Sequence, residues 1–277
     1  MLPGERQLAE LRLRAEKEPS NIEVLVALGA ACERAGLDDE AFGAWQRALR
    51  LDPACMPARQ GRLRHFRLLY AAERDPYERA AMVHRVGESG DRLAVPWLLT
   101  LLADAEPAVC QKVAEALGKL GEKAAVPALI GVLRNDAACA WWQASQAIAS
   151  IGDRAAVPHL IEILARGCRE ARAAAAAALG RLGDPSALEA LGRALGDQEP
   201  EVRRNAAQAI GALGSPGGMG ALAQALEDPD EETRLAAAEA LGVLAGREFR
   251  DGRFASAERQ ARRWWEKVGR RLWQQQT

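Results

Sequence analysis

Aromatic residues are scarce in this sequence: Phe, Trp and Tyr together make up 5% of 277 residues. Alanine dominates the apolar share instead. A sheet protein would need more β-branched and aromatic residues, whereas alanine favours helices that pack closely through small side chains. The composition therefore excludes a typical β-protein and predicts an all-α fold.

Long apolar runs are also missing. No segment approaches the roughly 20 apolar residues of a membrane helix, and charges interrupt the N-terminal stretch MLPGERQLAELRLRAEKEPS throughout. The five cysteines are scattered and include no CxxC pair. We therefore expect a reduced, cytoplasmic protein with no signal peptide and no membrane span.

The chain lacks an excess of positive charge. It has 37 Lys and Arg against 38 Asp and Glu, which gives a formal net charge of −1. Neutralisation of phosphates supplies most of the affinity of a dedicated DNA-binding protein, and such proteins are usually strongly basic. We therefore expect no nucleic-acid partner.

Motifs of catalysis and metal binding are absent as well. The three histidines, His65, His84 and His159, lie at unrelated positions, and HExxH, zinc-finger spacing, a P-loop and GxSxG do not occur. The sequence thus predicts no catalytic residue, no metal site and no cofactor, so we expect the protein not to be an enzyme.

What the sequence does contain is a repeat of 31 residues. The glycines that mark it are Gly90, Gly121, Gly152, Gly183 and Gly214. Three of the units begin almost identically, with GDRLAVPWLLTLL, GEKAAVPALIGVL and GDRAAVPHLIEIL. A period of this length with no insertion is typical of a solenoid, in which each unit packs on its neighbours.

Each unit contains two predicted helices. A proline at the start of the first helix, as at Pro96, Pro127 and Pro158, is compatible with helix initiation. In the second helix apolar residues recur every three or four positions, which predicts one buried stripe. The second helices are predicted to begin near Pro76, Pro107, Ala138, Arg169, Pro200 and Glu231. A glycine just before the closing leucine, as in Gly118 and Gly180, would let neighbouring hairpins approach closely.

These units resemble the short HEAT-like repeats of the phycobilin-lyase type. That family carries an acid between the helices and an arginine early in the second helix. Asp197 with Arg203 and Asp228 with Arg234 keep both, and Glu73 with Arg79 is a near match. The central repeats depart from the pattern, with the pairs Asp104 and Cys110, Asn135 and Trp141, and Arg166 and Arg172. We therefore expect the polar ladder between repeats to be interrupted at its centre.

The N-terminal region has a different period, with Pro19 and Pro53 separated by 34 residues. It resembles a tetratricopeptide (TPR) repeat at Leu28, Gly29, Gly36, Ala41, Trp45, Ala48 and Pro53. The resemblance implies a helical hairpin, preceded by a capping helix at 5–17 and followed by an irregular helix at 58–72.

The whole chain is thus predicted to be a right-handed α-solenoid. Its expected parts are TPR-like helices at 1–57, a connecting helix at 58–75, HEAT-like repeats at 76–245 and a C-terminal cap at 246–277. The cap carries nine Arg or Lys against four Asp or Glu between Arg247 and Arg271. Its aromatics would cover the last repeat, and contact with an acidic partner or with nucleic acid is the alternative reading.

The candidate binding site lies on the second helices, which the family resemblance places on the concave face. Trp141 and Trp142 are adjacent and point about 100° apart, so both cannot be buried. We expect Trp141 to lie near the buried stripe and Trp142 to face outward, where an aromatic anchor suits a partner helix or peptide. The predicted partner-binding residues are Gln111, Trp142, Gln146, Ala173, Ala177 and Arg204.

We therefore predict a non-catalytic scaffold or adaptor that binds a protein partner in the concave groove. The resemblance leaves two alternatives open: a bilin-lyase-like subunit or chaperone that acts on a protein partner, and a HEAT-like protein that binds DNA and excises damaged bases. The groove predicted here is near neutral, and no acid stands beside Trp142 in its column, which favours the scaffold.

Overall fold

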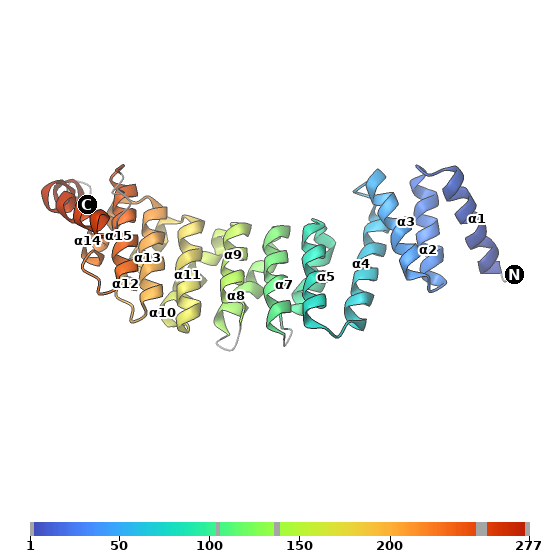
Figure 1. Cartoon of the computed structure of the whole chain (residues 1–277), viewed down its shortest axis with the longest axis horizontal. Coiled ribbons are helices and arrows are strands. Elements are labelled where there is room, and N and C mark those ends of the chain that lie inside the picture. The colour runs from blue at the N-terminus through green and yellow to red at the C-terminus, as the bar shows by residue number, and fades with distance from the viewer. Residues whose placement is uncertain (1–2, 104–105, 136–138, 248–253, 275–277) are drawn as a thin grey trace. The chain divides into compact units, whose positions relative to one another are not determined.

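The computed structural model describes residues 3–103, 106–135, 139–247 and 254–274. Within these ranges the chain is almost entirely helical and has no β-strand, which confirms the predicted all-α solenoid of helical hairpins (Figure 1). No described helix is long and apolar enough to cross a membrane. The chain divides into two compact units, Met1–Thr100 and Leu101–Thr277.

The N-terminal unit contains α1 (Pro3–Lys17), α2 (Ile22–Arg34), α3 (Asp38–Leu51), α4 (Met56–Ala72) and α5 (Pro76–Glu88). Helix α2 begins at an asparagine cap, where the side chain of Asn21 accepts a hydrogen bond from the N–H of Val24. Trp45 of α3 is buried, and its indole ring lies directly against Gly29 of α2 and Gly61 of α4. The two glycines leave room for the ring, so Trp45 holds three helices together.

A buried carboxylate joins α4 to the turn before α6 (Val95–Leu101). Asp91 accepts hydrogen bonds from Arg59 at 2.5 Å and from Arg62 at 3.2 Å. Burial by itself would raise the pKa of Asp91, but the hydrogen bond from Arg59, the backbone N–H of Leu93 and the charges of both arginines hold that pKa below its ordinary value. The N-terminal hairpins and the first 31-residue unit are thus linked by an ionised side chain.

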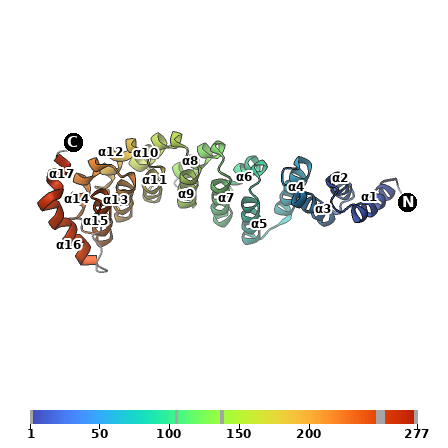
Figure 2. The same cartoon turned by 90° about the horizontal axis from the view of Figure 1, so that it is seen from above.

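The C-terminal unit stacks helical hairpins in two rows, and Figure 2 shows the row of second helices on the inner side of the bend. The second helices are α7 (Pro107–Leu120), α9 (Trp141–Ile151), α11 (Arg169–Leu182), α13 (Pro200–Leu213) and α15 (Glu231–Leu244). The first helices are α8 (Val126–Arg134), α10 (Val157–Arg166), α12 (Leu188–Ala194) and α14 (Met219–Ala225), each entered through one turn of 3-10 helix. The predicted starts of the second helices are confirmed, except that Ala138 lies outside the described residues and α9 begins at Trp141.

The glycines that mark the repeat have a conformational role. Gly121, Gly152 and Gly183 are the C-terminal caps of second helices and have φ between +65° and +72°. A residue with a Cβ is strained in this left-handed region, whereas glycine adopts it freely. The glycine period therefore fixes where each second helix ends and the chain reverses.

Other glycines set the distance between neighbouring second helices. A Cβ added to Gly180 would lie 2.7 Å from the Cα of Ala209 on the next helix, and the same relation holds between Gly118 and Ala147. The expected close approach of hairpins is confirmed at these positions. In α9 the equivalent residue is Ala149, so the contact between α9 and α11 carries an additional methyl group.

The polar ladder connects Arg172 and Arg203 to the acid of the following repeat, and Arg234 to an acid of the C-terminal segment. Arg172 Nη2 donates to Asp197 at 2.7 Å, Arg203 Nε donates to Asp228 at 2.7 Å and Arg234 Nε donates to Glu258 at 3.0 Å. The expectation that the interruption includes Arg172 was therefore wrong, because this arginine takes its acid from the next repeat and does not need one at Arg166. Asp104, another residue of the predicted pattern, lies outside the described residues.

The C-terminal segment packs on the last hairpin. It consists of α16 (Phe254–Trp264), a π-helical turn (Trp265–Gly269) and α17 (Arg270–Gln274). Ala257, Ala261 and Trp264 are buried on the side of α16 that contacts α15. Phe249 and the rest of 248–253 lie outside the described residues, as does the side chain of Phe254.

Candidate protein-binding face

Trp142 stands in the first turn of α9 with 45% of its surface exposed. All seven tryptophans lie in the described part of the chain, and each of the other six is buried or half-buried. The apolar stripe of α9 explains this orientation: Ala144 and Ile148 are buried, and Trp142 lies on another side of the helix. Among the described second helices of the C-terminal unit, Trp142 is thus the one exposed aromatic residue, and Tyr77 on α5 of the N-terminal unit is exposed as well.

Trp141 has a different role. Its side chain is half-buried, and its indole Nε1–H donates to the backbone carbonyl of Asn135 at 3.2 Å. Arg203 and Arg234, which occupy the equivalent position two and three repeats later, donate in the same way to the carbonyls of Asp197 and Asp228. Trp141 therefore replaces the ladder arginine as the residue that ties the turn to its own second helix.

Glutamines surround Trp142 along α7 and α9. Gln146 is exposed one turn after Trp142 on the same helix. Gln111 of α7 is half-buried, and its Nε2 donates to the backbone carbonyl of Cys139 at 3.2 Å. The Gln111 amide is thus held in place beside the start of α9, while the Gln146 amide is free to reorient toward a ligand.

The two alanines of α11 differ in exposure. Ala173 is only 3% exposed, so its methyl group can contribute little area to a partner. Its backbone carbonyl accepts a hydrogen bond from Asn205 of α13. Ala177, one turn later, is half-buried, and it provides the shallow apolar surface on this helix.

Charged residues lie on either side of this central surface and are paired. On α7, Lys112 contacts Glu115 at 2.7 Å. On α13, Arg204 forms an ion pair with Glu232 of α15. The face around Trp142 is therefore flanked by charges that are neutralised locally. To bind a ligand, Arg204 would have to give up its ion pair with Glu232 or contact both partners at once.

The sequence did not reveal that residues near the start of the second helix in the following repeat also contribute to this face. Gln111 reaches the carbonyl of Cys139 and Arg204 reaches Glu232, each 28 residues further along the chain. The same offset from Trp142 leads to Glu170, a half-buried residue that pairs with Arg169 at 2.6 Å. This offset is about one helical turn shorter than the 31-residue period, and a search of the sequence at that offset could have found these residues.

The described residues do not gather three or more His, Cys, Asp or Glu side chains in an arrangement that could hold a metal ion. The histidines are dispersed: His65 is buried and stacks on Phe42 at 4.5 Å between ring centroids, while His84 and His159 are exposed. All five cysteines are free thiols, and burial raises the pKa of Cys32 to about 11, so this thiol stays protonated at neutral pH.

These features define an α-solenoid of short helical repeats with an aromatic residue displayed on its second helices. The family model for HEAT repeats matches residues 66–139, 141–198 and 188–251, more than half of the chain. The chain belongs to the HEAT-repeat family. The match begins at residue 66, so the TPR-like character of the first hairpin stays a prediction.

Solved structures with related folds include human deoxyhypusine hydroxylase, which is 20% identical, covers 76% of this chain and 98% of its own, and has a TM-score of 0.39. The CpcE–CpcF complex of phycocyanin lyase from Nostoc sp. is 21% identical, with coverages of 95% and 94% and a TM-score of 0.38. A designed armadillo repeat protein for modular peptide recognition is 22% identical, with coverages of 72% and 98% and a TM-score of 0.43. At these identities the likeness shows the fold alone. No curated protein matches the sequence significantly.

Proposed function

We propose that this chain is a non-catalytic scaffold or adaptor that binds a helix or an extended peptide of a partner protein on its second helices. The proposal rests on the exposure of Trp142 on the row of second helices, because tryptophan is enriched among the residues that anchor protein interfaces. An aromatic ring with few rotatable bonds offers a large contact area at low entropic cost.

The neighbours of Trp142 support a peptide ligand. Gln146 can donate to and accept from a peptide backbone, and Ala177 leaves space for side chains above α11. Glu170 and Arg204 would add polar contacts at the border of the site. In this proposal the partner lies across α7, α9, α11 and α13, and the five free thiols suit a reducing, cytoplasmic setting.

The test uses matched tryptophan substitutions with a partner isolated from the native host by affinity capture and identified by mass spectrometry. Trp142→Ala should weaken binding by about 2 kcal/mol, as is common for aromatic anchors, and should leave the melting temperature nearly unchanged. Trp141→Ala should instead lower the stability by roughly 1–3 kcal/mol, because it removes packing and the hydrogen bond to Asn135. Val243→Ala on α15, which also truncates an exposed apolar side chain, is the control and should affect neither.

Normal binding by Trp142→Ala would contradict the proposed site. The N-terminal hairpin from Leu25 to Trp45 would then become the better candidate, and substitutions on its exposed faces would be the next experiment.

A further inference from the structure

The C-terminal helices carry a set of cations that the cap does not need for its own packing. Arg263, Lys267, Arg270 and Arg271, called the basic face below, follow one another along the C-terminal helices, and Lys267 stands three or four residues from each of the other three, which makes it their neighbour on the helical surface. All four are exposed, and within the described ranges none of them forms an ion pair. By contrast, the neighbouring Arg262 is engaged: it donates to the carbonyl of Leu226 and contacts Glu227 at 3.0 Å.

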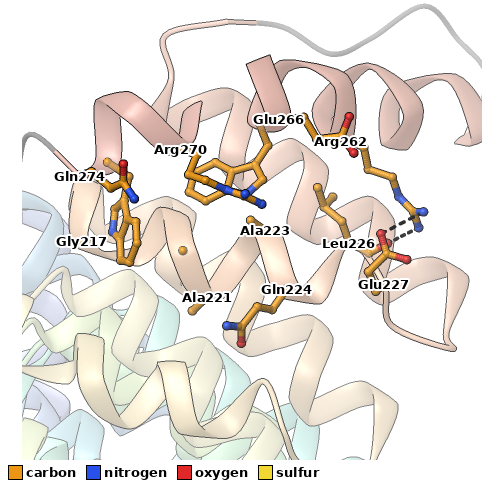
Figure 3. A pocket seen from close by; sticks show the side chains of 13 residues that line it. Gly217, Ala221, Ala223, Gln224, Leu226, Glu227, Arg262, Glu266, Arg270 and Gln274 are labelled. Carbon is orange, nitrogen blue, oxygen red and sulfur yellow. Dashed lines mark hydrogen bonds and ion pairs between the residues drawn. The ribbon is translucent and has the colours of Figure 1, made fainter. Parts of the chain in front are cut away.

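A groove adjoins the basic face. It has a volume of about 640 Å³ and lies between α14 and the C-terminal helices, as Figure 3 shows. Trp265 and Trp273 line it with ring centroids 6.2 Å apart. Trp273 packs closely on α14, since a Cβ added to Gly220 would lie 2.9 Å from its ring. Arg270 lines the groove and also belongs to the basic face, so the two features form one surface.

The residues around the groove indicate which ligand it suits. The apolar side of α16 is already buried against the last repeat through Ala257, Ala261 and Trp264, so this basic helix cannot insert that side into a membrane. Glu227 and Glu266 line the groove, and they would repel the closely spaced phosphates of a nucleic acid. An acidic peptide can place its separate carboxylates on the cations and keep them away from the two glutamates.

We propose that the basic face and the groove together bind an acidic segment of a partner protein that carries an aromatic or large apolar side chain. The carboxylates of the segment pair with Lys267, Arg270 and their neighbours on the basic face. The apolar side chain enters the groove and packs against the indole rings of Trp265 and Trp273. This surface is separate from the one around Trp142.

The test measures binding of a fluorescein-labelled synthetic peptide, rich in Glu and Asp around one central Phe, to the full-length protein by fluorescence anisotropy at low salt. The protein should bind this peptide, and added salt should raise the Kd because the charges are exposed. Lys267→Glu combined with Arg270→Glu should weaken binding about tenfold or more, since like charges then face each other. Replacement of the Phe in the peptide by Ala should also weaken binding.

Two controls keep the outcome specific. Arg166→Glu reverses an exposed charge at the C-terminal end of α10, away from the groove, and should change the Kd little. Trp142→Ala should also leave it unchanged, so that a failure here and a failure of the proposed function can be distinguished. Absence of binding at low salt, equal weakening by Arg166→Glu, or tighter binding of an oligothymidine probe than of the peptide would each overturn the proposal.

Discussion

Arg203 holds two successive repeats together through a single guanidinium group. Its Nε and Nη2 donate to the two carboxylate oxygens of Asp228 in the next repeat, at 2.7 and 2.8 Å. Its Nη1 donates to the backbone carbonyls of Asp197 and Gln198 in its own repeat. The side chains of Arg203 and Asp228 are only 10% and 6% exposed. If one of them were removed, little water could reach the other to solvate its charge.

Removal of this arginine should therefore be costly. We expect Arg203→Ala to lower the free energy of unfolding by about 3 kcal/mol, because it leaves a buried carboxylate and two carbonyls without their donor. Urea unfolding followed by circular dichroism would measure this. The control is Arg193→Ala, which breaks the exposed pair with Glu189 on α12 and should cost less than about 1 kcal/mol. Equal effects of the two substitutions would contradict the role assigned to the ladder.

Gly180 should be difficult to replace even by alanine. The added methyl group would meet the backbone of Ala209 at 2.7 Å, so two second helices must separate. We expect Gly180→Ala to destabilise the protein by roughly 1–2 kcal/mol, since overpacking outweighs the gain in helix propensity. Gly131→Ala on the exposed side of α8 has nothing within 4 Å and should instead stabilise by up to about 1 kcal/mol. A thermal melt of each variant would show whether the two substitutions have opposite signs.

Acid should weaken the ladder at Asp197. Burial alone would raise the pKa of Asp197, but the hydrogen bonds from Arg172 and from the backbone N–H of Glu199 hold it below its ordinary value of 3.8. Because the folded-state pKa is the lower one, the stabilisation is complete well above pH 3.8 and is lost as the pH falls through the folded pKa.

The measurement is the free energy of unfolding of the wild type and of Asp197→Asn across the acidic range. We expect the variant to be less stable at neutral pH, and the difference to shrink as the pH falls below that ordinary value. A difference that stays constant with pH would show that the carboxylate's charge is not what stabilises this contact.

The C-terminal segment should act as a structural cap. A deletion that ends at Ala245 removes Trp264 and its contacts with the last hairpin, and also the Arg234–Glu258 pair. Each large apolar side chain that loses its cover costs roughly 1.5–3 kcal/mol, so the melting temperature and the solubility should both fall. A truncated protein that is soluble and melts at the temperature of the full chain would show that the segment is a free arm.

Much of the fold could be predicted from the sequence because the 31-residue period determines where each helix begins and ends. Gly121 and its equivalents end the second helices, and glycine is the residue that tolerates the left-handed conformation required there. The buried stripe of a second helix, such as that formed by Val109, Val113 and Leu117 on α7, likewise follows from helical periodicity. The same reasoning predicted the exposure of Trp142, since the neighbouring Trp141 is half-buried and Trp142 points about 100° away.

The tertiary structure decided what depends on the offset between repeats. The sequence shows an acid and an arginine together only in the last units of the array, and only the stacking shows that Arg172 reaches Asp197 of the following unit. Stacking likewise buries Ala173, brings Glu232 to Arg204 and places the groove of Trp265 and Trp273 against α14. A local period determines each hairpin by itself. Which side chains meet across hairpins depends on the shift between neighbouring helices, which is set by close contacts such as that of Gly180 with Ala209.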